Sequence, residues 1–174
     1  MTLPMPTTLN ELLTAIDWSW TEWNTALNAL TDDQWRSLRD ENGWTIVDHI
    51  GHLARWERGA AYFLRGLPRH EGLGVDEALY LQGDDDAINA AIQLQTRSIE
   101  RDEIRTSAQA DHDDLRLLLS QLDDATLAKT YRHFLPDEPG EGDGPLVMDV
   151  IFSNTAEHYA EHLQWVWELT GRER

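Results

Sequence analysis

Apolar side chains recur along this chain at intervals of three and four residues, the spacing of one face of an α-helix. The first such stripe follows Thr8, and Glu11 three residues later completes a capping signal for a helix N-terminus. The stripe consists of Leu9, Leu12, Leu13, Ile16, Trp20, Trp23, Leu27 and Leu30. The pattern predicts one long helix here, followed by a short capped helical turn over residues 32–38.

A second amphipathic stretch begins at Thr45, where Asp48 supplies the matching capping residue. It continues to about Arg65 and ends before a Gly-Leu-Pro sequence, which is typical of a helix C-terminus. Residues 67–84 contain three glycines ahead of an acidic triplet, so we expect them to form a loop that crosses the molecule.

Two further regions complete the helical pattern. The apolar stripe of residues 85–122 changes phase part-way, which predicts a short helix to about Thr96, a break and a long third helix. Residues 136–145 are rich in proline and glycine and predict a loop, and the last helix is expected over residues 146–170. The sequence therefore predicts an all-α fold: one four-helix bundle domain spanning residues 1–174, with a short extra helix and long loops.

The composition narrows the class of function. The chain has no cysteine, which excludes disulfides, thiolate metal sites and a thiol nucleophile of its own. It has 32 acidic and 14 basic residues and a net charge of −18, which argues against nucleic acid or an anionic membrane surface as a partner. No apolar run approaches the ~20 residues that span a bilayer, and no secretory signal is visible, so we expect a cytoplasmic protein.

Two histidines in the last predicted helix are the first candidate for chemistry. His158 and His162 are four residues apart, so their rings project from consecutive turns in the middle of an apolar stripe. Each histidine on its own is explained by one buried hydrogen-bond partner. A pair in this position is harder to satisfy that way, and a divalent metal ion would satisfy both rings at once.

The same helix carries a second apolar strip on the side away from the histidines. Its members are Phe152, Ala156, Leu163 and Trp167. One explanation is that the N-terminal segment or the long loops cover this strip. The other, which we favour, is a homodimer contact about a two-fold axis.

A metal ion would need at least one more protein ligand. His70 and His133 lie beside glycines and a proline loop, and His112 lies in an Asp-rich stretch that predicts an exposed face. The second helix remains, and it carries His49 and His52. Helical periodicity places His49 nearer the apolar centre of that helix, so periodicity alone favours His49.

Two sequence strings in these helices resemble a known family. Residues 44–57 read WTIVDHIGHLARWE, and residues 154–162 read NTAEHYAEH. Their order and spacing resemble the signatures of the DinB-like superfamily, nearest to its ClbS/DfsB-type branch, and the likeness covers nearly the whole chain. The resemblance implies an up-down-down-up bundle that holds a divalent ion on three histidines, one from the second helix and two from the last.

The resemblance assigns the three ligands to His52, His158 and His162. The family position lies eight residues after a tryptophan and is followed by leucine, which here gives His52. His49 then becomes a neighbour that supports the site or caps the helix, with direct ligation by His49 left as an alternative. Imidazole ligands suit zinc, nickel, iron and copper, so the metal could be Zn, Ni or Fe.

The resemblance also implies a class of reaction. DinB-like relatives include bacillithiol transferases and mycothiol-dependent maleylpyruvate isomerases, whose metal activates the thiol of a small cofactor. A metal-dependent thiol S-transferase or hydrolase acting on a small electrophile is therefore expected, and any low-molecular-weight thiol must come from outside this cysteine-free chain. The alternatives are a non-catalytic small-molecule binding or self-resistance protein, and a structural dimeric bundle.

Three charged residues of the second helix are further candidates. Asp48 lies one turn before His52 and is expected to orient it or to accept a proton. Glu57 lies near the core side of the helix, where a carboxylate needs a partner: an arginine, a tryptophan N–H, or a role as general base near the metal. Arg55 is a candidate for binding an anionic group of a substrate or cofactor, or for a surface ion pair.

Overall fold

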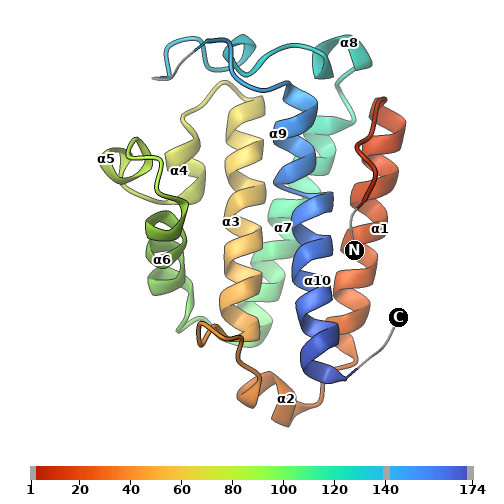
Figure 1. Cartoon of the computed structure of the whole chain (residues 1–174), viewed down its shortest axis with the longest axis vertical. Helices are drawn as coiled ribbons and strands as arrows, with labels where there is room; N and C mark the ends of the chain where they lie inside the picture. Colours follow the sequence, from red (N-terminus) through yellow and green to blue (C-terminus); the bar gives the residue numbers. More distant parts are fainter. Residues whose placement is uncertain (1–2, 139–141, 172–174) are drawn as a thin grey trace.

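The computed structural model describes residues 3–138 and 142–171, and its long helices form a four-helix bundle (Figure 1). The bundle consists of α1 (Leu9–Asn28), α3 (Ile46–Leu64), α7 (Arg101–Leu119) and the consecutive pair α9 (Val147–Ser153) and α10 (Ala156–Thr170). In the view of Figure 1, α1 runs downward, α3 and α7 both run upward, and α9 and α10 run downward. The predicted up-down-down-up bundle is confirmed. None of the described helices is long and apolar enough to cross a membrane.

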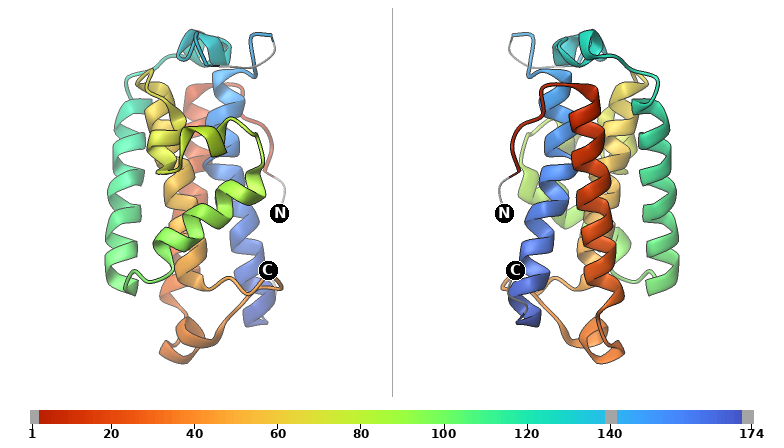
Figure 2. Two further views of the ribbon diagram at one scale, coloured as in Figure 1. Left: turned by 90° about the vertical axis from the view of Figure 1, so that its left-hand side faces the viewer. Right: turned by 90° about the vertical axis from the view of Figure 1, so that its right-hand side faces the viewer.

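The parallel course of α3 and α7 requires a long return connection between them. This connection contains α4 (Arg69–Leu73), α5 (Glu77–Tyr80) and α6 (Asp85–Thr96), which lie along the outer side of α3 (Figure 2). The prediction of a loop over residues 67–84 is therefore wrong in part, because α4 and α5 are too short to show a helical stripe. The remaining short elements are α2 (Asp32–Ser37), α8 (Asp124–Leu127) and a 3₁₀ turn at Tyr131–His133.

Capping interactions fix where α1 and α3 begin. The hydroxyl of Thr8 accepts the backbone N–H of Glu11 at 3.2 Å, as predicted. The hydroxyl of Thr45 accepts the N–H of Asp48 at 3.1 Å, and the Asp48 carboxylate accepts the N–H of Thr45 at 2.8 Å. This reciprocal box defines the first turn of α3, and with it the faces on which the following histidines lie.

The last helix is interrupted, which corrects the prediction of one continuous helix over residues 146–170. Thr155 has φ −133° and ψ −97°, well outside the helical region. Its hydroxyl donates to the carbonyl of Ile151 at 2.6 Å, and the Asn154 amide donates to the carbonyl of Val150 at 2.7 Å. These side chains take over backbone acceptors of the preceding turn, a known way of bending or breaking a helix.

The second apolar strip of the last helix is covered within the chain. Phe152, Ala156 and Leu163 are buried, Trp167 is half-buried, and α10 packs along α1. The strip therefore needs no second copy of the chain to cover it, and the homodimer stays a prediction without support from this surface.

A polar network joins all four bundle helices through the core. Glu57 of α3 is fully buried, and its carboxylate accepts a hydrogen bond from His112 Nδ1 of α7 at 2.8 Å and one from the Tyr159 hydroxyl of α10 at 2.9 Å. Trp20 of α1 stacks on the His112 ring with the centroids 3.9 Å apart. The prediction that His112 is exposed is wrong. The aspartates on either side of it in the sequence point to other faces of α7, while His112 itself points into the core.

We expect Glu57→Ala to lower the free energy of unfolding by about 3–5 kcal/mol, because it removes the acceptor of two buried donors. Glu57→Gln should cost less, since its amide oxygen still accepts one of the two bonds. Glu103→Ala, in the exposed first turn of α7, is the control and should lower stability by at most about 1 kcal/mol, since it loses only its interaction with the helix N-terminus. Urea unfolding followed by far-ultraviolet circular dichroism measures all three, and equal midpoints for Glu57→Ala and the control would contradict the prediction.

Candidate functional site

Four histidines face one another where α3 lies beside α10. His52 Nε2 lies 2.8 Å from His158 Nε2, and His49 Nδ1 lies 2.8 Å from His162 Nδ1. Ring nitrogens of His52, His158 and His162 all lie within 4.8 Å of one another. These are the three ligands that the family resemblance assigned, while His49 joins the cluster through His162.

Helix geometry explains how four rings from two helices meet. Residues 158 and 162 are one turn apart on α10, and residues 49 and 52 are nearly one turn apart on α3, so each pair shares a helix face. Tryptophan rings enclose the cluster, with Trp44 5.4 Å from His52 and Trp165 4.0 Å from His49 between ring centroids.

Burial keeps all four imidazoles neutral at physiological pH. It lowers the pKa of His158 to about 4, with a further contribution from nearby His49, and it lowers the pKa of His49 to about 4 against the opposing pull of Asp40. The pKa values of His52 and His162 lie well below the usual 6.5, first because of burial and then because of neighbouring histidines. Neutral imidazoles retain a lone pair, the form in which histidine binds metal ions.

The hydrogen-bond inventory of the cluster fits a metal ion. A neutral imidazole has one N–H and one lone pair, so two rings that face each other share one proton between two nitrogens. His52 Nδ1 is also buried without a hydrogen-bond partner. Three lone pairs directed at one ion, at about 2.0–2.1 Å each, is an arrangement that zinc and similar divalent ions adopt in proteins.

Asp48, which was expected to orient His52 or to accept a proton, lies in the N-terminal cap of α3. Its Oδ2 accepts bonds from both the N–H and the hydroxyl of Thr45 at 2.8 Å, and its Oδ1 is buried without a hydrogen-bond partner. The side chain near His52 is instead Asn89 of α6, which favours the protonated form of His52 and accepts the indole N–H of Trp56 at 2.9 Å. Asn89 can approach because Gly51 leaves room for α6: a Cβ there would lie 2.5 Å from Thr96 Oγ1.

Arg55 and Glu57 make their contacts away from the four clustered histidines. The Arg55 guanidinium is close to Gly74, and its pKa is lowered first by burial and then by Arg58. Glu57 is engaged by His112 and Tyr159 in the core network, so neither oxygen is free to act as a base. Its hydrogen bond with Tyr159 nevertheless holds in place the residue that follows His158 on α10.

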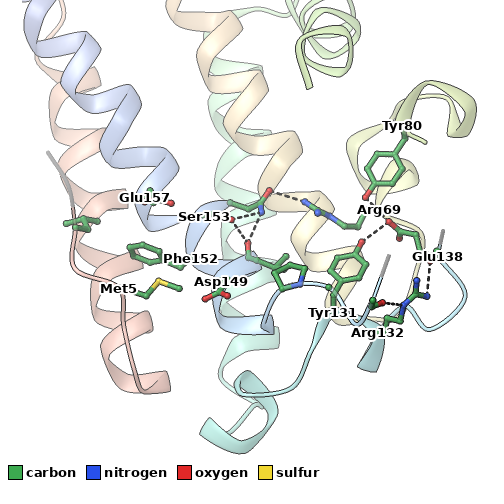
Figure 3. Close-up of a pocket in the computed structure, with 16 residues that line it drawn as sticks. Met5, Arg69, Tyr80, Tyr131, Arg132, Glu138, Asp149, Phe152, Ser153 and Glu157 are labelled. Atoms are coloured by element: carbon green, nitrogen blue, oxygen red, sulfur yellow. Dashed lines mark hydrogen bonds between the residues drawn. The ribbon is translucent and has the colours of Figure 1, made fainter. Parts of the chain in front are cut away.

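A cavity of about 570 Å³ is lined by residues of α4, α5 and α9 and by Tyr131 and Glu138 (Figure 3). Glu138 accepts hydrogen bonds from the hydroxyls of Tyr80 at 3.0 Å and Tyr131 at 2.9 Å. Arg69 donates to the Asn154 amide oxygen at 3.0 Å, while its buried Nε has no hydrogen-bond partner. A cavity of this size with a few convergent polar groups suits a small molecule.

The Trp56 ring lies between Arg69, which lines the cavity, and the histidine cluster. The Arg69 guanidinium carbon lies 5.7 Å from the Trp56 ring, and the same ring lies 6.3 Å from the His52 ring. Asn154, which lines the cavity, precedes His158 by four residues. Sequence reasoning missed Arg69, Tyr80 and Tyr131, since they come from separate short segments that carry no common pattern.

Comparisons with known proteins agree with this architecture. A crystal structure of an uncharacterised protein from Escherichia coli UTI89 superposes with a TM-score of 0.73 over 96% of this chain and 95% of that chain, at 16% sequence identity. A crystal structure of a protein from Streptococcus pneumoniae superposes with a TM-score of 0.77 over 99% of this chain and 96% of that one, at 11% identity. At these identities the likeness shows the fold alone.

Sequence comparison supplies the family. No curated protein matches the chain, and the placement in the ClbS/DfsB-type branch stays a prediction. The model of the DinB superfamily matches residues 15–166, a span that includes α3, α7 and α9, most of α1 and α10, and the four clustered histidines. The chain therefore belongs to the DinB superfamily.

Proposed function

We propose that this protein is a metal-dependent enzyme that joins a low-molecular-weight thiol to a small electrophile, or hydrolyses such an electrophile. The observation that carries the proposal is the convergence of three neutral, largely buried imidazoles whose nitrogens lie within 4.8 Å of one another. His52, His158 and His162 would hold the ion. Bound there with open positions, a divalent ion such as Zn, Ni or Fe supplies a Lewis acid that lowers the pKa of a thiol or of water.

The residues around the cluster would prepare the reaction. Trp44 and Trp165 shield the histidines from solvent, which strengthens electrostatic interactions there. In the transfer, the thiol gives its proton to solvent and its sulfur bonds to the electrophilic carbon. The leaving group departs with the electron pair of the broken bond.

The cavity beside Trp56 would bind the rest of the substrate or thiol cofactor. Arg69 offers a guanidinium with a free buried Nε, and the hydroxyls of Tyr80 and Tyr131 offer further polar groups around Glu138. This assigns ligand binding to Arg69 in preference to Arg55, whose guanidinium lies beside Gly74.

A second candidate is a non-catalytic protein that binds a small molecule. One observation favours it: both oxygens of Glu57 are engaged, by His112 and Tyr159, and one oxygen of Asp48 is held by Thr45 in the helix cap. A thiol with a lowered pKa needs no protein base, whereas hydrolysis usually does, so this observation also ranks S-transfer above hydrolysis.

We expect the untagged protein to bind one divalent ion per chain. His52→Ala, His158→Ala and His162→Ala should each lose most of it, because each removes one of three ligands. His70→Ala, which alters a histidine outside the cluster, is the control and should retain the ion. Elemental analysis of the purified variants measures the stoichiometry, and full occupancy in the His158 and His162 variants would refute the site.

The metal-free protein should lose stability as the pH falls from about 6.5 toward 4. The unfolded chain protonates its histidines near pH 6.5, whereas burial holds the pKa of His49 and His158 at about 4 in the folded state. The unfolded state therefore binds more protons in this window, and the free energy of unfolding decreases. Thermal unfolding across this range measures the effect, and His158→Leu should show a shallower decrease than the wild type.

Metal-loaded protein should conjugate at least one of bacillithiol, mycothiol or glutathione to a model electrophile such as a chlorodinitrobenzene. Arg69→Ala should raise KM about 10-fold or more with a smaller effect on kcat, since a charge-assisted hydrogen bond contributes about 1.5–3 kcal/mol. Arg65→Ala, which removes an arginine paired with Asp114 outside the cavity, is the control. Turnover that persists after metal removal, or no turnover with any of the three thiols, would favour the binding protein.

A further inference from the structure

We infer that Asp40 and His49 form a relay that positions His162 for metal binding. The inference rests on the proposed metal site and adds to it two residues that are not ligands. Neither residue belongs to the three-histidine group, and Asp40 lies outside the helices altogether, in the segment between α2 and α3.

The relay is a line of three side chains. His162 Nδ1 lies 2.8 Å from His49 Nδ1, and on the far side of the same ring His49 Nε2 lies 3.4 Å from Asp40 Oδ2. The second contact is longer than the first and is not aligned as a hydrogen bond, so His49 Nε2 is a buried donor facing a carboxylate without a better partner. The Asp40 and His49 side chains are 12% and 6% exposed, so little water competes for either group.

The order of donors and acceptors along the line follows from the chemistry of each group. A carboxylate only accepts, so His49 must carry its proton on Nε2 to face Asp40 favourably. His49 Nδ1 then carries a lone pair, so it can only accept a hydrogen bond, and the donor is the N–H at His162 Nδ1. His162 is thereby fixed as the tautomer with a free lone pair on Nε2, the nitrogen available for the ion.

The surrounding structure holds Asp40 and His49 in place. Asp40 Oδ1 accepts the N–H groups of Asn42 and Trp44 at 2.8 Å each, which leaves Oδ2 directed at His49. The His49 ring packs on Trp165 of α10 at 4.0 Å between centroids. A supporting carboxylate or hydrogen-bond acceptor behind a metal-binding histidine commonly contributes 10–100-fold to metal affinity.

Asp40→Asn is the sharpest test because it preserves the shape of the side chain. Its oxygen can keep the bonds to Asn42 and Trp44, while its NH₂ group then faces His49 Nε2. His49 must shift its proton to Nδ1 to avoid opposing donors, and that proton opposes the one on His162. We expect Zn²⁺ affinity, measured in the full chain by competition with a chelator, to fall 10–100-fold.

Variants at His49 separate positioning from packing. His49→Asn can place an amide oxygen near the position of Nδ1 and accept from His162, so it should retain affinity within about 5-fold of the wild type. His49→Phe fills space but accepts nothing, and should fall 10–100-fold, as Asp40→Asn does. Adding Asp40→Asn to His49→Asn should cause little further loss, because the relay is already cut.

The control is Asp84→Asn, the same chemical change at an exposed aspartate that also accepts a backbone N–H, from Ala87 at 3.1 Å. It should bind Zn²⁺ as the wild type does. The absorption spectrum of the Co²⁺-loaded proteins gives a readout that packing alone would not move. It should change in Asp40→Asn and His49→Phe and stay unchanged in the control.

Each alternative outcome overturns the inference in a distinct way. Wild-type affinity and an unchanged Co²⁺ spectrum in both Asp40→Asn and His49→Phe would show that the pair does not position His162. Loss of bound metal in His49→Phe as complete as in His162→Ala would make His49 a ligand. A wild-type protein that binds no Zn²⁺ would remove the proposed function itself, and the relay with it.

Discussion

The placement of four neutral imidazoles, two buried and two half-buried, between α3 and α10 is the constraint on which this structure depends. A buried ring nitrogen without a partner is costly, so the lone pairs and N–H groups of His49, His52, His158 and His162 must be matched. Within the cluster this matching is incomplete, because His52 Nδ1 and His49 Nε2 have no hydrogen-bond partner. In the proposed metal site, an ion would engage the lone pairs of the nitrogens that face one another between α3 and α10, while Asp40 faces His49 Nε2 from behind.

The rest of the bundle holds the two helices in the register that this matching needs. The Thr45–Asp48 box fixes the start of α3, and Glu57 joins α3 to α7 and α10 through His112 and Tyr159. A buried carboxylate with two donors is a directional contact, unlike apolar packing, which tolerates a helix sliding or rotating by a fraction of a turn. The core network and the histidine cluster thus set the same α3–α10 alignment.

The distribution of charge separates the site from the surface. The 32 acidic residues give the chain its net charge of −18, yet the cluster itself contains imidazoles only, and the nearby carboxylates Asp40 and Asp48 also accept bonds from backbone N–H groups. Most other carboxylates lie at exposed helix starts, in loops or in ion pairs such as Arg116–Asp17. The excess of acidic residues therefore belongs to the surface of the protein, and the candidate metal site is built from histidines.

The sequence by itself determined the features that depend on neighbours along the chain. Apolar spacing located the four bundle helices, Thr8 and Thr45 located two helix starts, and the four-residue spacing of His158 and His162 placed two rings on one face. Periodicity favoured His49, whereas the structure groups His52 with His158 and His162 and places His49 against His162, because the position of α10 decides which ring nitrogens meet. The burial of His112, the break at Thr155 and the cavity around Arg69 also required the tertiary structure. Each depends on a contact between segments far apart in the sequence, or on a competition between side-chain and backbone hydrogen bonds that residue spacing does not encode.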